Sequence, residues 1–157
     1  MPSDDGQQLG TTRESALGWS APDVIPAISY VDAPAAIEWL ERAFGFERHM
    51  VHEGEDGTIA HAELRAGAGM VMLGSEREGA AHDRFPVGSP RKVGGLTAGF
   101  YVIVGDPDAH HERAKGAGAE IVMELTDQDY GSREYTARDP EGHLWTFGTY
   151  RPTSAAG

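Results

Sequence analysis

The chain has 157 residues, of which 39% are hydrophobic and 24% charged, as expected for a globular protein of one domain or two small fused repeats. Its 25 acidic and 13 basic residues give a formal net charge of −12 with no Lys/Arg cluster, so we expect no nucleic-acid partner. Cysteine is absent, which excludes disulfides, thiol nucleophiles and thiolate metal sites. The lack of cysteine also agrees with a cytoplasmic location, which we expect. No apolar run reaches about 18 residues, so we expect no membrane partner.

The N-terminal segment, MPSDDGQQLGTTRESALGWSAPD, is polar and lacks the basic and apolar regions of a secretory signal. We expect a flexible tail over residues 1–22, from which only Trp19 packs against the domain. A single domain is expected over residues 23–152, followed by a short tail over 153–157. Within the domain we expect repeat one at 24–74, a linker at 75–95 and repeat two at 96–150.

The first repeat is predicted to begin with a strand over residues 27–31, followed by a helix that ends at Gly45. A proline in the first turn and a glycine just past the end follow the asymmetry that helices favour. Ile37, Leu40 and Phe44 recur on one face of this helix and predict a stripe that faces the core. Three strand-like runs follow, at residues 47–52, 58–65 and 70–74.

The segment over residues 75–95 is predicted to connect the two repeats. It is too rich in glycine and proline to form a long regular element, and a connection of this length inside a compact domain is usually functional or disordered. Its only aromatic residue, Phe85, precedes Pro86 and is therefore restricted to an extended conformation. We predict a flap in which Phe85 closes over a ligand; the alternative is a mobile linker with Phe85 tucked against the nearest sheet.

The second repeat is recognised by placing the chain against itself. At a shift of 73 residues, YVDAPAAIEWLERAFGF lies over IVGDPDAHHERAKGAGA, and Gly45 meets Gly118. A strand over 97–104 and a helix capped by Asp106 are predicted to begin this copy. Its three further strands are predicted at 120–125, 133–138 and 144–149. Both halves are thus βαβββ, and together they predict an α+β fold in which two curved sheets enclose a cleft.

Three motifs, AAIEWLERAFGF, AHAELRAGAGMVML and YGSREYTARDPEGHLWTFGT, occur in this order at repeat spacing. With the tandem βαβββ units they make the chain resemble the vicinal oxygen chelate superfamily, which contains glyoxalase I, bleomycin-resistance proteins and ring-cleaving dioxygenases. The resemblance covers residues 24–152 and is strongest to the bleomycin-resistance-like branch. It implies a cup-shaped mixed sheet formed by the two repeats and completed in a homodimer.

In the metalloenzymes that the chain resembles, four side chains at the floor of the cup hold a divalent ion. The resemblance places these four positions at Pro26, Met72, Gly99 and Thr146. Proline and glycine have no donor side chain, methionine is a soft thioether and threonine a weak neutral oxygen. We therefore predict no metal, no cofactor and no catalytic residue at this site. An alternative metal site formed by His61, Glu63 and His82 has no spacing to support it.

Hairpin register predicts which side chains share the cup. Pairing Arg65 with Met70 places Glu63 opposite Met72, and the equivalent pairing in the second repeat places Ala137 opposite Thr146. The predicted ligand-binding residues are aromatic, flexible apolar or polar: Tyr30, His61, Glu63, Met72, Phe85, Tyr101, Arg133, Tyr135 and Thr146. Aromatic walls with a few polar groups are typical of small-molecule pockets.

Each member of this set also has a structural alternative. The tyrosines can be ordinary half-buried sheet residues, and Glu63 with Arg133 can form a structural ion pair. The adjacent histidines His110 and His111, about 100° apart on a helix, are expected to be solvated.

Two functions follow from the sequence. The first is a small-molecule binding protein that needs no metal and sequesters an aromatic or cationic drug or metabolite in the cup, as the resemblance to bleomycin-resistance proteins implies. The second is a glyoxalase- or dioxygenase-like lyase, isomerase or oxygenase that acts on a small metabolite. A metal-free enzyme in which His61 and Glu63 share a proton belongs to this second class.

Overall fold

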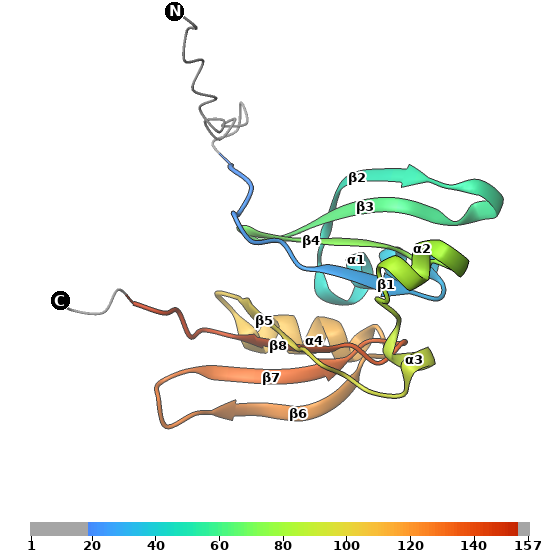
Figure 1. The fold of residues 1–157 in the computed structure, drawn as a ribbon. Coiled ribbons are helices and arrows are strands. Elements are labelled where there is room, and N and C mark those ends of the chain that lie inside the picture. The colour runs from blue at the N-terminus through green and yellow to red at the C-terminus, as the bar shows by residue number, and fades with distance from the viewer. Residues whose placement is uncertain (1–18, 154–157) are drawn as a thin grey trace, which may run out of the picture.

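Two four-stranded mixed sheets form the framework of the protein, and each belongs to one half of the chain (Figure 1). The computed structural model describes residues 19–153, so most of the two predicted tails lies outside the described residues. Residues 19–22 are described, and Trp19 packs on His49 with a ring distance of 5.6 Å, as expected for a residue that docks. Among the described helices, none is long and apolar enough to cross a membrane.

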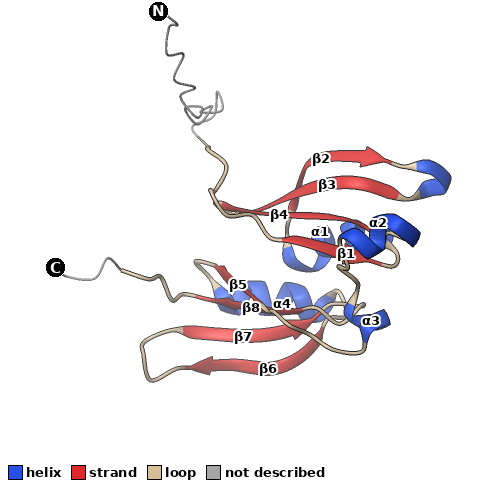
Figure 2. Ribbon diagram, in the orientation of Figure 1, coloured by secondary structure: helices blue, strands red, loops and turns tan. Residues whose placement is uncertain are grey.

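Each half is a βαβββ module, which confirms the predicted α+β fold. Module one consists of β1 (Ala27–Tyr30), α1 (Ala33–Phe44), β2 (Glu47–Glu53), β3 (Ile59–Ala66) and β4 (Gly69–Ser75), with strand order β1-β4-β3-β2. Module two consists of β5 (Phe100–Ile103), α4 (Pro107–Gly116), β6 (Glu120–Asp127), β7 (Arg133–Arg138) and β8 (Leu144–Gly148), with strand order β5-β8-β7-β6. The connection between them contains two short helices, α2 (Gly79–Arg84) and α3 (Pro90–Val93) (Figure 2).

The caps of the two long helices correct the predicted repeat spacing. Asp32 caps α1 by accepting a hydrogen bond from Ala35 N, and Asp106 caps α4 in the same way, so these caps lie 74 residues apart. Gly45 and Gly118, which both adopt a positive φ after the helices, lie 73 residues apart. The predicted shift of 73 therefore holds for these glycines, whereas the helix starts (Ala33 and Pro107) lie 74 residues apart and the helix ends (Phe44 and Gly116) lie 72 apart, because α1 has 12 residues and α4 has 10.

The core lies where the helices and the inner faces of both sheets meet. Phe44, at the end of α1, contacts Trp145 and Phe147 of module two with ring centroids 5.9 and 4.6 Å away. The guanidinium of Arg113 on α4 donates to the last carbonyls of α1, at Glu41 (2.9 Å) and Arg42 (3.0 Å). Each module thus completes the core of the other, and neither inner face is left open.

His111 is buried in this core and His110 is partly buried at its edge, so the expectation that both are solvated is wrong. The ring of His110 lies between Tyr135 Oη (2.6 Å from Nδ1) and the carbonyl of Phe44 (2.9 Å from Nε2). Burial lowers the pKa of His110 and so favours the neutral ring, in which one nitrogen accepts from Tyr135 and the other donates to the carbonyl of Phe44. The buried His111 has its Nε2 atom 2.9 Å from Glu124 Oε2.

The loop between β7 and β8 attaches module two to module one through two buried carboxylates. Asp139 accepts hydrogen bonds from Tyr30 Oη (2.7 Å), Trp145 Nε1 (3.1 Å) and two backbone N–H groups of its own loop. Glu141 accepts from the backbone of Val31 (2.6 Å) and Asp32 (2.9 Å) and from Ser89 Oγ (2.5 Å). These bonds join the β7–β8 loop to the β1–α1 turn and to the connection.

We expect Asp139→Asn to destabilise the protein by about 2–4 kcal/mol, because an amide would present a donor where four donors already converge. Urea unfolding measures the loss. The exposed Asp129→Asn is the matched control and should change the free energy of unfolding by at most about 0.5 kcal/mol. Equal effects of the two variants would show that the carboxylate of Asp139 does not hold the modules together.

A second expectation concerns pH. The folded-state pKa of His110 lies below its unfolded pKa, so its contribution to stability is fully present above the unfolded pKa and is lost as the pH falls from there through the folded-state pKa. His110→Gln should therefore be less stable than the wild type at pH ~7.5, and the gap should narrow at pH ~5.5. Urea unfolding at both pH values tests this, and a gap of constant size would contradict it.

Candidate functional site

The face of the first sheet that is turned away from α1 carries several of the predicted site residues. Strand pairing places Met50, Glu63, Met72 and Ala27 side by side in one row across β2, β3, β4 and β1. The intervening residues, such as Leu73, point into the core. The first hairpin therefore has the predicted register, with Glu63 opposite Met72.

A cleft of about 500 Å³ lies over this face, between β1, β3 and β4 and the start of the connection. His61, Met72 and Phe85 all line this cleft, although they come from β3, β4 and the connection, respectively. Phe85 is 53% exposed, and the guanidinium carbons of Arg77 and Arg84 lie 5.5 and 5.6 Å from its ring centre. The structure thus brings together three of the nine predicted ligand-binding residues.

A polar cluster adjoins this cleft. The Nε2 atom of His61 lies 3.0 Å from Glu63 Oε1, and Nε2 of His49 lies 3.7 Å from Glu63 Oε2. The guanidinium of Arg65 stacks over the Trp19 ring at 4.9 Å. Glu63 is thus a half-buried carboxylate shared by two histidines, a group that can accept a hydrogen bond from a ligand or exchange a proton with it.

The register of the second hairpin is displaced by one residue from the prediction. Thr136, not Ala137, lies opposite Thr146, and their hydroxyl oxygens are 2.8 Å apart. The reason is the length of the β7–β8 loop. Asp139 N donates to His143 O and Gly142 adopts a φ of 103°, so three residues lie between this pair, whereas the predicted register needs an even number. A shift of one residue exchanges the two faces of a strand.

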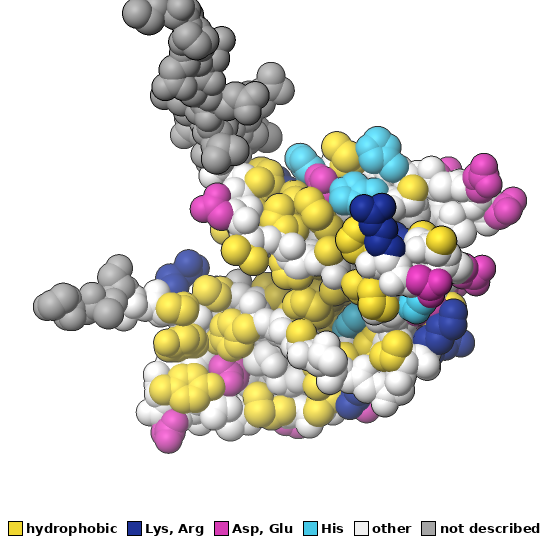
Figure 3. All heavy atoms as spheres, in the orientation of Figure 1, with side chains coloured by type: hydrophobic (Ala, Val, Ile, Leu, Met, Phe, Trp, Pro, Cys, Tyr) yellow, Lys and Arg dark blue, Asp and Glu magenta, His cyan; other side chains and the backbone are white. Residues whose placement is uncertain are grey.

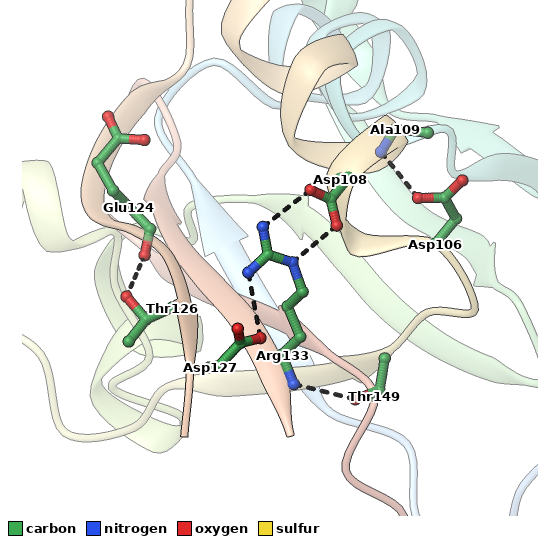
Figure 4. Close-up of polar contacts among 8 residues, drawn as sticks. All are labelled: Asp106, Asp108, Ala109, Glu124, Thr126, Asp127, Arg133 and Thr149. Atoms are coloured by element: carbon green, nitrogen blue, oxygen red, sulfur yellow. Dashed lines mark hydrogen bonds and ion pairs between the residues drawn. The ribbon is translucent and has the colours of Figure 1, made fainter. Parts of the chain in front are cut away.

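Arg133 and Tyr135 consequently point toward α4, and their predicted position in the cup is wrong. Tyr135 is fully buried and bonded to His110, and burial raises its pKa. Figure 4 shows the guanidinium of Arg133 between Asp108 on α4 and Asp127 on β6. Its Nε lies 2.8 Å from Asp108 Oδ2, and its Nη1 lies 3.1 Å from Asp127 Oδ1. Hydrogen bonds to Arg133 hold the pKa of Asp108 below its ordinary value. The proposed Glu63–Arg133 ion pair is likewise wrong.

Tyr30 is also displaced from the predicted lining. Because β1 pairs Ala27 with Met72, the side chain of Tyr30 lies on the opposite face, where it is fully buried. Burial, and then the nearby carboxylate of Asp139, raise its pKa well above the ordinary value. Its hydroxyl serves the contact between modules and is not exposed to a ligand.

Tyr101 and Thr146 remain on the outward face of the second sheet, as predicted, where β5 and β8 pair them directly. A second cleft, of about 430 Å³, reaches from Tyr101 across the gap between modules to Met70, and its other lining residues are mostly apolar. A third cleft, of about 370 Å³, shares Ile28 with the first and Phe100 with the second. Figure 3 shows hydrophobic side chains gathered in the furrow between the two modules.

The donor set at the family's metal position does not fit a divalent ion. The observed pairing places Ala27 beside Met72 and Tyr101 beside Thr146, whereas Pro26 lies one residue before Ala27 and Gly99 two residues before Tyr101. Neither the four predicted positions nor these two strand partners supply a strong donor. Alanine has no donor, methionine is soft, and threonine and tyrosine offer neutral hydroxyls. Over residues 19–153 no group of three or more His, Asp or Glu side chains is arranged to hold a metal, so the alternative with His61, Glu63 and His82 is not found.

Comparison with known proteins identifies the class to which this fold and site belong. Residues 25–147 match the model of the Glyoxalase/Bleomycin resistance protein/Dioxygenase superfamily, and the chain belongs to this superfamily. It is 32% identical over 147 residues to "Uncharacterized protein Rv0887c" of Mycobacterium tuberculosis, covering 91% of this chain and 85% of that protein. It is 33% identical over 127 residues to "Uncharacterized protein Mb0911c" of Mycobacterium bovis, covering 81% and 82%.

Solved structures agree with this membership. The crystal structure of TioX from Micromonospora sp. ML1 is 35% identical, with a TM-score of 0.64 over 83% of this chain and all of that chain. The bleomycin-binding protein from Streptomyces verticillus, solved with copper(II)-bleomycin, is 22% identical with a TM-score of 0.56, over 82% of this chain and 95% of that one. At this identity the second similarity shows the fold alone.

Proposed function

We propose that the protein binds an aromatic or cationic small molecule, without a metal ion, on the outward faces of its two sheets. The observation that carries this proposal is the convergence of His61, Met72 and Phe85 on one cleft, beside paired sheet positions whose side chains offer no strong metal donor. Sequestration of a drug or metabolite is the role that such a site supports. A cytoplasmic location is part of the proposal, because a chain without cysteine needs no oxidising compartment.

Each group in the cleft contributes differently to binding. Met72 offers a flexible, polarisable surface that adapts to an irregular ligand. His61, held by Glu63 at 3.0 Å, offers a directional hydrogen bond. Phe85 is the flap of this proposal, because its ring is half exposed at the mouth of the cleft and belongs to the connection and not to a sheet.

We expect a neutral aromatic probe such as naphthol to bind in this cleft after exhaustive treatment with a chelator. Met72→Trp should weaken its binding about tenfold or more, because the larger ring fills the space. Val122→Trp, at an exposed strand position of module two, is the matched control and should bind like the wild type. Phe85→Ala should weaken binding less than Met72→Trp. Fluorescence titration measures all four proteins, and equal affinities would refute the cleft as the site.

An enzyme remains the second candidate, and the His61–Glu63 contact is the observation that favours it. A histidine and a carboxylate 3.0 Å apart on a half-buried sheet face can pass a proton to and from a bound metabolite. Turnover of a hemithioacetal or a catechol, lost in Glu63→Gln, would establish this candidate over simple binding. Stoichiometric divalent metal in protein purified without chelator would point to the metal-dependent form.

The proposal includes a homodimer. The outward face of the first sheet exposes the apolar side chain of Met50, and Val24, which lines the cleft between the modules, is exposed as well. A second copy packed against these residues would cover them and deepen that cleft, while the tyrosines on the outward face of the second sheet stay open. We expect sedimentation at micromolar concentration to give twice the mass of the 16.8 kDa chain. A stable monomer at this concentration would remove the dimer from the proposal.

A further inference from the structure

Three tyrosines stand around one carboxylate on the outward face of the second sheet. Tyr101 comes from β5, Tyr130 from the turn before β7 and Tyr150 from the segment after β8. The rings of Tyr101 and Tyr130 each stand at 83° to the ring of Tyr150, with centroids 6.4 and 5.8 Å away. The three residues are 42%, 55% and 46% exposed, so their rings remain open to a ligand. We call this group, with Glu134, the tyrosine cage.

Glu134 forms the floor of the tyrosine cage and is only 5% exposed. Its carboxylate accepts hydrogen bonds from Tyr130 Oη (2.5 Å), Ser132 Oγ (2.9 Å) and Tyr101 Oη (3.2 Å). All three donors are neutral, and no ion pair within residues 19–153 includes Glu134. The neighbouring Arg133 points to the other face of the sheet, where Asp108 and Asp127 bind it (Figure 4). The floor therefore carries a negative charge without a partner cation.

The tyrosine cage is held in place by the backbone. The N–H of Tyr150 donates to Tyr101 Oη (3.0 Å) and to Ser132 Oγ (3.1 Å). Gly148 pairs with Glu134 across β7 and β8, and a side chain there would collide with the Tyr101 hydroxyl and with Cβ of Glu134. The hydrogen bond to Glu134 raises the pKa of Tyr130 to about 12. These contacts order the rings before any ligand arrives.

We propose that the tyrosine cage binds the positively charged end of the ligand, an organic ammonium group. A cation is attracted to the faces of aromatic rings, and an unpaired buried carboxylate beneath them adds a full opposite charge. Tyr101 also lines the cleft of about 430 Å³ between the modules, so a ligand can place its ammonium group in the cage and an apolar body in that cleft. This inference rests on the proposed function and narrows its ligand to one class.

A purely structural network would account for the hydroxyl contacts but not for the rings. Phenol oxygens suffice to hold the segment after β8 against the sheet. Three rings that stay about half exposed around an uncompensated carboxylate are what ammonium recognition requires. The two explanations differ in what they predict for charge, because only the cage discriminates a cation from a neutral molecule of the same shape.

The test uses choline and its uncharged isostere, in which carbon replaces the quaternary nitrogen. We expect the full chain to bind choline about tenfold more tightly than the isostere. NMR titrations that monitor the ring signals of tyrosine measure the two affinities. Tyr150→Leu keeps apolar bulk but removes one ring face, and should lose most of this preference. Glu134→Gln keeps the shape of the floor and should also lose it. Glu112→Gln, which makes the same change at an exposed position of α4 outside the cage, is the matched control, with the preference retained.

Equal binding of choline and its isostere, or undiminished choline binding by Tyr150→Leu, would overturn the cage. Because Tyr150 is exposed, Tyr150→Leu keeps the test valid if Glu134→Gln fails to fold. Naphthol, titrated in the same samples, separates this result from the proposed function. A protein that binds naphthol but does not prefer choline retains the cleft and loses the cage; one that binds neither loses both.

Discussion

Two buried carboxylates in the β7–β8 loop, Asp139 and Glu141, decide how the halves of this protein meet. Between them they accept seven side-chain hydrogen bonds, four at Asp139 and three at Glu141, and every donor is neutral. A buried carboxylate without such donors would be costly, so the loop is stable only where the β1–α1 turn and the connection supply them. The docking is therefore specific, because the Tyr30 hydroxyl and the N–H groups of Val31 and Asp32 must lie within hydrogen-bonding distance of the two carboxylates.

This docking also determines which sheet faces are left for function. Once the β7–β8 loop lies against the β1–α1 turn, Phe44 enters the core of module two and both helices are covered. The remaining faces of the two sheets point outward, and their side chains differ. One carries Met72, His61 and Glu63; the other carries Tyr101, Thr146 and the acid at Glu134. One arrangement of the backbone thus presents two chemically distinct surfaces.

The superfamily to which the chain belongs includes enzymes and binding proteins on one fold, so the fold alone does not assign the activity. What the structure shows of this chain is the chemistry of the paired positions at the centre of the two sheets. Where a metal-binding protein needs nitrogen and charged oxygen donors, Ala27, Met72, Tyr101 and Thr146 offer a methyl group, a thioether and two neutral hydroxyls. Apolar and aromatic side chains at these positions suit the retention of an organic molecule.

Local sequence determined the elements and much of their pairing. The alternation in β3 and β4 and the two-residue turn at Gly67 and Ala68 were enough to predict that Glu63 lies opposite Met72. The cap of α4 at Asp106 and the glycines that follow both helices were also predicted from the sequence, since capping depends on residues close in sequence. The sequence also predicted a cup lining that includes His61 and Met72, with Phe85 brought to it by a connection that crosses near an end of the cup, and these three residues line one cleft.

Tertiary structure decided the rest, and the reason is the length of one turn. A three-residue loop closed by Gly142 shifts β7 against β8 by one position, which sends Tyr135 and Arg133 inward and leaves Glu134 facing out. The turn sequence allowed either loop length; the contacts of Asp139 and Glu141 with module one select the observed one. Tyr130 and Tyr150, far apart in sequence and outside the strands, meet over Glu134 only as a result. Register between strands depends on such long-range contacts, whereas strand identity does not.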